Sequence, residues 1–197
     1  DMEGYEADDL IATYAKQAAA NGAQVTIVSS DKDLMQLVDD KITMLDAMKN
    51  KVIGPAEVFE KFGVGPELVI DVQALAGDSA DNVPGVQGIG VKTAALLINE
   101  YGTLDDVLAR AGEIKQNKRR EKLIEQADMA RLSRDLVTLK IDVPIDVPLS
   151  TFVVKKPDPE ALVGFLREQG FRSLVITLEN RFGLTGSAGA DNAPESA

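Results

Sequence analysis

The segment Gln24-Val-Thr-Ile-Val-Ser-Ser-Asp-Lys-Asp33 joins a short β-strand pattern to two aspartates. Residues 24–29 predict a buried strand, because their β-branched side chains form a run of strand length. Asp31 and Asp33 then fall at the carboxyl end of this strand, where open α/β sheets place their ligands. The segment therefore predicts an α/β fold with an acidic site at one edge of the sheet.

Two further acidic groups accompany this pair, Glu6-Ala-Asp8-Asp9 and Asp78-Ser-Ala-Asp81, in a chain without histidine or cysteine. Carboxylates gathered so densely repel one another, and the commonest reason to gather them is to hold hard divalent cations. A two-metal site needs several carboxylates to offset the cations, and the water that the metal activates requires no histidine base. The three groups predict metal-ion chemistry on an anionic substrate.

Each acidic group also has an ordinary structural explanation. In the first group, Glu6 and Asp9 share a helix face and could complement the helix dipole, whereas Asp8 points away. The second group could be an N-cap followed by a first-turn acid, and the third could be turn residues. These explanations do not account for three such groups at two element starts and one strand end, so the cation site is the favoured hypothesis.

The composition predicts a soluble protein without disulfides. The chain has 197 residues and is 45% hydrophobic, enough to bury a core in one domain or two small ones. Its apolar runs are too short to cross a bilayer and no signal segment opens it, so we expect a cytoplasmic protein with no membrane partner. The opening residues lead straight into a helical pattern, which suggests a fragment that lacks upstream strands.

The patterning predicts strands first and helices afterwards. Strands are expected at residues 24–29, 42–46 and 51–53. Helices are expected at residues 7–20, 33–38, 55–62, 66–76, 91–101, 104–111, 118–128, 129–138, 159–168 and 173–182. Residues 141–151 should be an extended connector, and the Gly/Ala/Ser-rich end after residue 183 has the composition of a flexible linker.

A glycine-rich turn precedes the predicted helix at residues 91–101. Gly85, Gly88 and Gly90 have the wrong spacing for a dinucleotide fingerprint, and no strong strand precedes them. Glycines let the backbone approach a phosphate closely, and the amides at the start of the helix, with Lys92 and Thr93 beside them, point at that phosphate. The turn is therefore predicted to bind the DNA backbone without sequence specificity, the alternative being an ordinary helix connection.

A basic run counters the acidic net charge of −11, which by itself argues against a nucleic-acid partner. Seven negative charges lie in the three acidic groups, where bound cations would neutralise them. Lys118, Arg119 and Arg120 are predicted as a second contact with the DNA backbone. The alternative is a solvated helix face whose basic residues pair with nearby glutamates.

Four motifs, in order and with the family's spacing, resemble the 5′-nuclease domain of bacterial DNA polymerase I. The resemblance covers residues 1 to about 182 and rests on Gly4-Tyr-Glu-Ala-Asp-Asp9, Ser30-Asp-Lys-Asp-Leu34, Gly77-Asp-Ser-Ala-Asp-Asn-Val-Pro-Gly85 and Gly88-Ile-Gly-Val-Lys-Thr-Ala94. It implies the C-terminal part of a PIN-like (resolvase-like) parallel-sheet nuclease domain at residues 1–70. A helical helix–three-turn–helix DNA-binding region would follow at residues 71–182, and a linker toward a polymerase portion at residues 183–197.

The resemblance also implies an activity and its residues. The family is a 5′ to 3′ exonuclease and flap endonuclease that removes primer RNA and displaced 5′ flaps in replication and repair. It implies Mg²⁺ or Mn²⁺, two ions in all, at Glu6, Asp8, Asp9, Asp31, Asp33, Asp78 and Asp81, with Asp31, Asp33, Asp78 and Asp81 catalytic. It further implies K⁺ at the glycine-rich turn and, as the partner of a monomer, nicked or branched duplex DNA with a 5′ flap.

Two alternatives remain open at this point. The family has further metal-site aspartates and a helical arch upstream of the matched motifs, and neither is present in this sequence. The chain could therefore be a non-catalytic DNA-binding module whose acids are structural. A related metal-dependent ribonuclease is disfavoured, because such an enzyme does not need a clamp for the duplex backbone.

Overall fold

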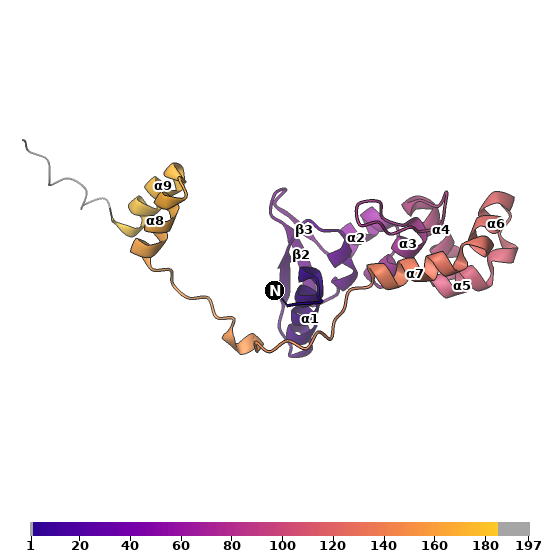
Figure 1. Cartoon of the computed structure of the whole chain (residues 1–197), viewed down its shortest axis with the longest axis horizontal. Coiled ribbons are helices and arrows are strands. Elements are labelled where there is room, and N and C mark those ends of the chain that lie inside the picture. Colours follow the sequence, from indigo (N-terminus) through magenta and orange to yellow (C-terminus); the bar gives the residue numbers. More distant parts are fainter. Residues whose placement is uncertain (1, 185–197) are drawn as a thin grey trace, which may run out of the picture. The chain divides into compact units, whose positions relative to one another are not determined.

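The computed structural model describes residues 2–184, which fall into two compact units divided between Leu149 and Ser150 (Figure 1). Most of the predicted linker, residues 185–197, lies outside the described residues. No helix within residues 2–184 combines the length and the apolar character needed to cross a membrane.

The N-terminal part of the larger unit contains a three-stranded mixed sheet (Figure 1). β1 (Val25–Val28) runs parallel to β2 (Ile42–Asp46), and β2 pairs antiparallel with β3 (Lys51–Ile53) through a hairpin. α1 (Ala7–Ala20) packs against β1 and against the 3₁₀ helix η1 (Asp33–Leu37). The parallel pair places the end of β1 and its two aspartates at one edge of the sheet, as the sequence predicted.

Helices form the remainder of this unit. They are α2 (Pro55–Phe62), η2 (Pro66–Leu68), α3 (Val69–Ala76), α4 (Val91–Tyr101), α5 (Leu104–Ala109), η3 (Ala111–Glu113), α6 (Asn117–Glu125) and α7 (Ala127–Val137). α3 lies at their centre, packed against α4 and α7. It is apolar on nearly every face, which is typical of a buried helix.

Three predicted helices end earlier or break where the sequence pattern continues. Leu68 (φ −113°, ψ 4°) separates η2 from α3, and Arg110 (φ −103°, ψ 14°) ends α5. Gln126 (φ −111°, ψ 22°) ends α6, so that α7 begins at Ala127. Each of these residues lies in the bridge region of backbone conformations, which apolar periodicity does not reveal. The predicted helix at residues 33–38 is the shorter 3₁₀ helix η1.

One continuous core joins the sheet to the helices. Its buried apolar side chains run from Ala12 in α1 to Ala130 in α7 and include Leu34 of η1 and Leu75 of α3. Each fully buried leucine contributes roughly 1.5–3 kcal/mol relative to an exposed one. The segments that carry the acidic groups are thus fixed by the same core.

The smaller unit is a pair of helices, α8 (Pro159–Glu168) and α9 (Arg172–Phe182), packed on each other. Asp158 caps α8 by accepting hydrogen bonds from the amides of Glu160 and Ala161 at 3.0 and 3.2 Å. Val163, Leu166 and Val175 form its small core. The predicted boundaries of these two helices agree with the structure to within one residue.

Candidate metal centre

The acidic pair after β1 is held by hydrogen bonds within its own turn. The amide of Asp31 donates to Ser29 Oγ at 3.0 Å, and the amide of Asp33 donates to Asp31 Oδ1 at 3.0 Å. Asp31 therefore closes a side-chain turn just before η1, and one of its oxygens is occupied by the backbone. Asp33, the first residue of η1, keeps its carboxylate for contacts outside the turn.

The third acidic group lies in a loop that follows α3. The amide of Asp78 donates to the carbonyl of Val83 at 2.9 Å, and the amide of Val83 donates back at 2.7 Å. Gly77 (φ 70°) packs directly on the chain near Gly85, and a Cβ on Gly77 would come within 2.7 Å of the Val83 carbonyl oxygen. Glycine is needed there both for the positive φ and for the close backbone approach. The loop is thereby held with Asp78 and Asp81 on the side of η1.

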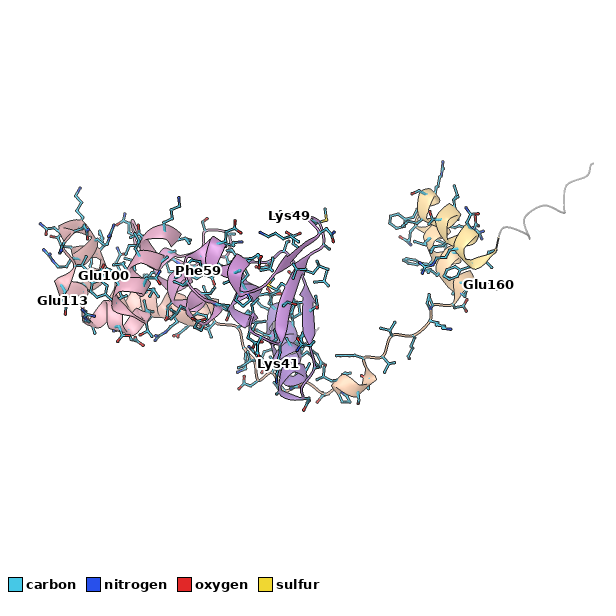
Figure 2. All side chains as sticks on the ribbon, turned by 180° about the vertical axis from the view of Figure 1, so that it is seen from behind. Lys41, Lys49, Phe59, Glu100, Glu113 and Glu160 are labelled. Carbon is cyan, nitrogen blue, oxygen red and sulfur yellow. The ribbon has the colours of Figure 1, made fainter. Side chains whose placement is uncertain are left out.

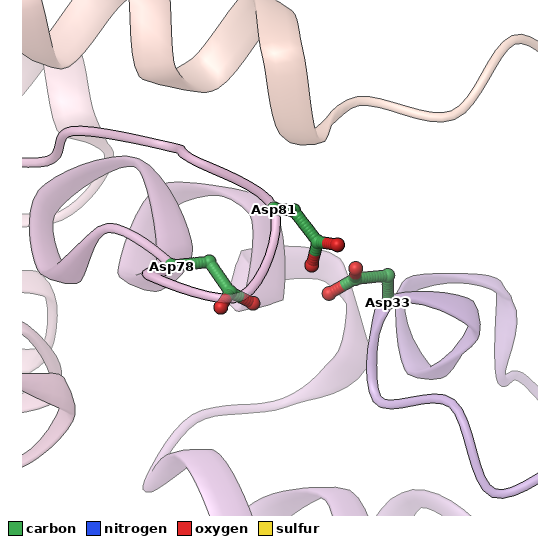
Figure 3. A group of neighbouring side chains, drawn as sticks. All are labelled: Asp33, Asp78 and Asp81. Carbon is green, nitrogen blue, oxygen red and sulfur yellow. The ribbon is translucent and has the colours of Figure 1, made fainter.

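Three carboxylates from these two segments converge (Figure 3). One oxygen each of Asp33, Asp78 and Asp81 lies within 4.8 Å of the other two. Figure 3 shows Asp33 reaching from the start of η1 toward the loop that carries both other residues. Among the described residues this is the one group of three or more acids that is close enough to share a metal ion.

The ammonium of Lys32 occupies the middle of this cluster. Its Nζ forms an ion pair with Asp78 and lies 3.5 Å from Asp33 Oδ1 and 3.6 Å from Asp81 Oδ2. Burial lowers the pKa of Lys32, but the hydrogen bond to Asp78 and the surrounding carboxylates outweigh it, so the net shift is upward. The same hydrogen bond lowers the pKa of Asp78. An all-oxygen donor set that already holds a cation fits a hard divalent ion.

A buried glutamine fixes the orientation of Asp33. Gln73 of α3 is 3% exposed and its amide nitrogen donates a hydrogen bond to Asp33 Oδ1. Burial raises the pKa of Asp33, and the hydrogen bond from Gln73 and the charge of Lys32 oppose that rise. Neither Gln73 nor Lys32 was predicted from the sequence as a site residue. The available signals were an amide inside an apolar helix and a lysine between two aspartates.

The remaining predicted acids lie outside this cluster. Asp9 Oδ1 accepts a hydrogen bond from the amide of Lys140 at 2.8 Å, and Asp9 Oδ2 accepts one from the amide of Glu6 at 3.3 Å. Burial raises the pKa of Asp8, and the charges of Asp31 and Asp33 raise it further. Asp8 therefore lies within electrostatic reach of the second acidic group, whereas both oxygens of Asp9 bind the backbone.

The glycine-rich turn is held on one side by the core and is open to solvent at Gly88. Val86 and Ile89 are buried, and the amide of Val86 donates to the carbonyl of Leu75 in α3 at 2.8 Å. Gly88 (φ 82°) has open space around its α-carbon, and Gly90 is the N-cap of α4. The first amides of a helix lack acceptors within the helix, so this turn presents N–H groups to an anion. Lys92 and Thr93 follow directly in the first turn.

The basic run lies beside this turn. A hollow of about 650 Å³ is lined by residues from both segments, namely Gln87, Gly88, Ile89, Gln116, Lys118, Arg119, Glu121 and Lys122. The amide of Gln87 donates to Gln126 Oε1 at 2.8 Å, which ties the turn to the end of α6. Arg120 does not line this hollow, and its guanidinium donates to the Ile114 carbonyl at 2.9 Å and to Asn117 Oδ1 at 2.8 Å. Lys118 and Arg119 therefore face the hollow, and Arg120 stabilises the start of α6.

Fold and site together define a class of protein: an α/β domain with clustered carboxylates at the carboxyl end of a strand, followed by a helical region with an anion-binding turn. Residues 1–63 match the family model described as 5′-3′ exonuclease, N-terminal resolvase-like domain, and residues 64–160 match 5′-3′ exonuclease, C-terminal SAM fold. The chain belongs to this 5′-3′ exonuclease family. The predicted fold class, a resolvase-like α/β domain followed by a helical region, is confirmed.

The chain is also similar in sequence to individual DNA polymerase I proteins of bacteria. The chain is 59% identical over 175 residues to DNA polymerase I of Rhizobium leguminosarum, a match that covers 89% of the chain and 17% of that protein. The chain spans about a fifth of the length of the curated relatives it matches, with 21% of the Bacillus caldotenax DNA polymerase I covered.

Solved structures of bacteriophage T5 proteins share the fold. The T5 5′-exonuclease with bound divalent metal ions (zinc) is 27% identical with a TM-score of 0.66, over 71% of this chain and 52% of that one. The T5 D15 flap endonuclease (D155K), in a pseudo-enzyme-product complex with DNA and metal ions, is 26% identical with a TM-score of 0.64, over 71% of this chain and 51% of that one. Divalent metal ions are therefore bound by relatives of the same fold.

Proposed function

We propose that the chain is part of a 5′ to 3′ exonuclease and flap endonuclease that hydrolyses phosphodiesters of DNA and primer RNA in replication and repair. One observation carries the proposal: Asp33, Asp78 and Asp81 converge from two segments around a single cation, the Lys32 ammonium. Their repulsion is a cost that binding a divalent cation would offset.

Each residue of the cluster has a defined part in this proposal. Asp33, Asp78 and Asp81 would hold Mg²⁺ or Mn²⁺, and Gln73 would keep Asp33 directed into the site through its amide hydrogen bond. Divalent cations bound there would supply an activated water and stabilise charge on the phosphorus. Among the other predicted acids, Glu6, Asp8 and Asp31 would add negative charge around a second ion, whereas Asp9 would hold the start of α1 through its two backbone hydrogen bonds.

The second part of the site would hold the substrate. The turn from Gly85 to Thr93, including Lys92, would bind a phosphate of duplex DNA through backbone amides, and Lys118 and Arg119 would bind a neighbouring phosphate across the hollow. Contacts of this kind read the backbone and not the bases, which suits an enzyme that recognises branched or nicked duplex DNA with a 5′ flap. A K⁺ ion at the turn is part of the same proposal.

The organisation of the parent protein is likewise proposed and supported by the relatives. Residues 1–70 would form the α/β part of the nuclease domain and supply Asp33, and residues 71–182 would form the DNA-binding region and contribute Asp78 and Asp81 to the metal centre. A polymerase portion would be covalently linked, as suggested by the DNA polymerase I relatives that the chain matches over a fifth of their length. We further propose a cytoplasmic monomer.

The test uses a labelled 5′-flap DNA and the chain, with Mg²⁺ or with EDTA. We expect cleavage only with the divalent metal, and Asp78→Asn should reduce it by on the order of 100-fold, because the variant loses a carboxylate charge at the metal. The control is Asp128→Asn, which alters a fully exposed aspartate that pairs with Arg131 on α7. Cleavage at an undiminished rate in EDTA would falsify the proposal.

The use of Asp9 favours a second candidate, a DNA-binding module that does not cut. Both oxygens of Asp9 accept backbone hydrogen bonds, so at least one predicted ligand has a structural role that needs no metal. Such a module would bind duplex DNA equally well with Mg²⁺ or EDTA and leave the flap substrate intact. Fluorescence-anisotropy binding to the same DNA, with and without the metal, separates the two candidates.

A further inference from the structure

Lys32 is distinguished from the other lysines by the number of carboxylates around it. It lies between Asp31 and Asp33 in the sequence, yet its side chain reaches across to the loop after α3. There its Nζ contacts Asp33, Asp78 and Asp81 at once, and the side chain is 33% exposed. Among the described residues, Lys16, Lys49, Lys51, Lys122 and Lys140 each form an ion pair with a single carboxylate.

The position of the ammonium coincides with the position that a metal ion would need. The three carboxylate oxygens that could share a metal lie within 4.8 Å of one another, and Nζ is among them. A divalent ion needs direct contact with carboxylate oxygens at about 2.0–2.6 Å, which leaves no room for an ammonium between the same groups. Two cations so close would also repel each other strongly.

We propose that Lys32 is a tethered counter-ion, which holds Asp33, Asp78 and Asp81 together when no metal is bound and is displaced when a divalent cation binds. The inference rests on the proposed function, because it assumes that this cluster binds the metal. It assigns to Lys32 a positioning role: the lysine prevents the carboxylates from spreading apart, and its contacts are lost when the metal takes its place.

A thermodynamic cycle makes this role measurable. Neutralising Lys32 removes favourable contacts from the metal-free protein only, because the metal-bound protein has already lost them. The free energy lost by the metal-free fold must therefore reappear as tighter metal binding. Charge-assisted contacts of this kind correspond to a change of about tenfold in each equilibrium constant.

The experiment is a calorimetric titration of the chain with Mn²⁺ and Mg²⁺, paired with urea unfolding in EDTA. Lys32→Met should bind the metal about tenfold more tightly than the unsubstituted chain, and its metal-free unfolding constant should rise by about the same factor. At saturating metal, Lys32→Met and the unsubstituted chain should have the same free energy of unfolding. Lys32→Gln, which is neutral and more polar, should reproduce the result if the methionine variant does not fold.

Lys49→Met is the matched control. Lys49 lies at the tip of the β2–β3 hairpin (Figure 2), where its Nζ pairs with Asp46 at 3.0 Å and its side chain is 76% exposed. The Lys49→Met substitution removes the same charge as Lys32→Met, but outside the cluster. The metal affinity of this variant should therefore change by less than about twofold, because screened surface charges interact weakly. An equal gain in both variants would show a general charge effect and overturn the proposal.

Nitrogen NMR of the unsubstituted chain gives an independent measurement. The ammonium signal of Lys32, protected by its ion pairs, should be visible in EDTA and should be lost to solvent exchange when Mg²⁺ is added. A signal that persists at saturating metal, or weaker metal binding by both Lys32 variants, would overturn the displacement. If the unsubstituted chain binds no divalent metal at all, the proposed function itself fails, which is a distinct outcome.

Discussion

The acidic group at the start of α1 and the acidic cluster between η1 and the loop after α3 look alike in sequence, but their oxygens face different partners. Asp9 accepts hydrogen bonds from two backbone amides, those of Glu6 and Lys140. In the cluster, Asp33 and Asp78 face a side-chain cation instead. A carboxylate that faces amides stabilises the fold, whereas carboxylates that face one another need a cation.

The difference shows that carboxylate density alone does not identify a metal ligand. Asp78 has one oxygen on the amide of Ala80 at 2.9 Å and the other on Lys32, so the backbone holds the side chain and leaves one oxygen for a cation. Both oxygens of Asp9 are used by the backbone. What separates the two roles is the number of oxygens left after the local hydrogen bonds are made.

The largest expected effect is on metal affinity within the cluster. Asp33→Asn should weaken Mn²⁺ binding by on the order of 100-fold, because it removes a charged ligand, and even supporting residues typically change affinity 10-fold to 100-fold. Isothermal titration calorimetry of the chain measures the change. Asp9→Asn is the comparison variant and should change the affinity by less than about twofold. Equal losses in both variants would show that the two acidic groups form one site.

A smaller effect is expected from the residue that orients Asp33. Gln73→Met keeps the volume of the side chain and removes the amide that donates to Asp33 Oδ1. Metal affinity should fall about tenfold, as for other groups that hold a metal ligand from behind. Gln126→Met is the matched control, because it makes the same substitution at a glutamine that accepts a hydrogen bond from the amide of Gln87 in the glycine-rich turn and not from the cluster. Unchanged affinity in Gln73→Met would show that Asp33 needs no support.

The fold was largely predictable because its elements are long or strongly patterned. The parallel strands and α1, α2, α4 and α8 follow from apolar periodicity and from glycine and proline at their ends. The breaks at Leu68 and Arg110 were not predicted, and the break at Gln126 was expected only after residue 128, because the position of each depends on the conformation of a single residue set by tertiary packing. Periodicity reports which face is buried, and it does not report where one turn of helix stops.

The candidate site was predictable as a set of residue types and not as a geometry. The sequence indicated seven acids, but the convergence of Asp33 with Asp78 and Asp81 depends on the packing of η1 against α3. The sequence shows Lys32 only as a member of a motif, whereas in the structure its side chain extends to the loop after α3 and lies at the centre of the cluster. Side-chain direction in a loop is decided by contacts distant in sequence, which spacing along the chain cannot supply.

The next smaller effect is a loss of stability, expected when Asp9 in the acidic group at the start of α1 is replaced. Asp9→Ala should lower the free energy of unfolding by about 1 kcal/mol, because two amides at the start of α1 and at Lys140 lose their acceptor. Urea unfolding in EDTA measures the loss. Asp128→Ala, at a side chain that accepts only from Arg131 among the described residues, should cost less than half as much. A loss in Asp9→Ala that disappears on addition of Mg²⁺ would instead assign Asp9 to the metal site.

The smallest effect concerns another carboxylate that faces amides, and it has a distinct pH dependence. Asp39 Oδ1 accepts from the amides of Lys41 and Ile42 at 2.9 and 2.8 Å, and Oδ2 pairs with Lys16 Nζ at 3.0 Å. Burial raises the pKa of Asp39, but these hydrogen bonds outweigh it and the net shift is downward. A lowered folded-state pKa means stability that is present above the unfolded value near pH 4 and is lost as the pH falls through the folded value.

Asp39→Asn keeps the oxygen that accepts from the two amides and removes the charge that pairs with Lys16. At pH 7 we expect a loss of about 0.5 kcal/mol in the free energy of unfolding, the magnitude of a partly exposed ion pair. The difference from the unsubstituted chain should shrink as the pH is lowered below 4, where the wild-type carboxylate becomes protonated, and Mg²⁺ should not alter it. Urea unfolding across this pH range, with and without Mg²⁺, measures both. A pH-independent difference would trace the loss to packing, and a difference that Mg²⁺ abolishes would place Asp39 with the cation-binding carboxylates and not with Asp9.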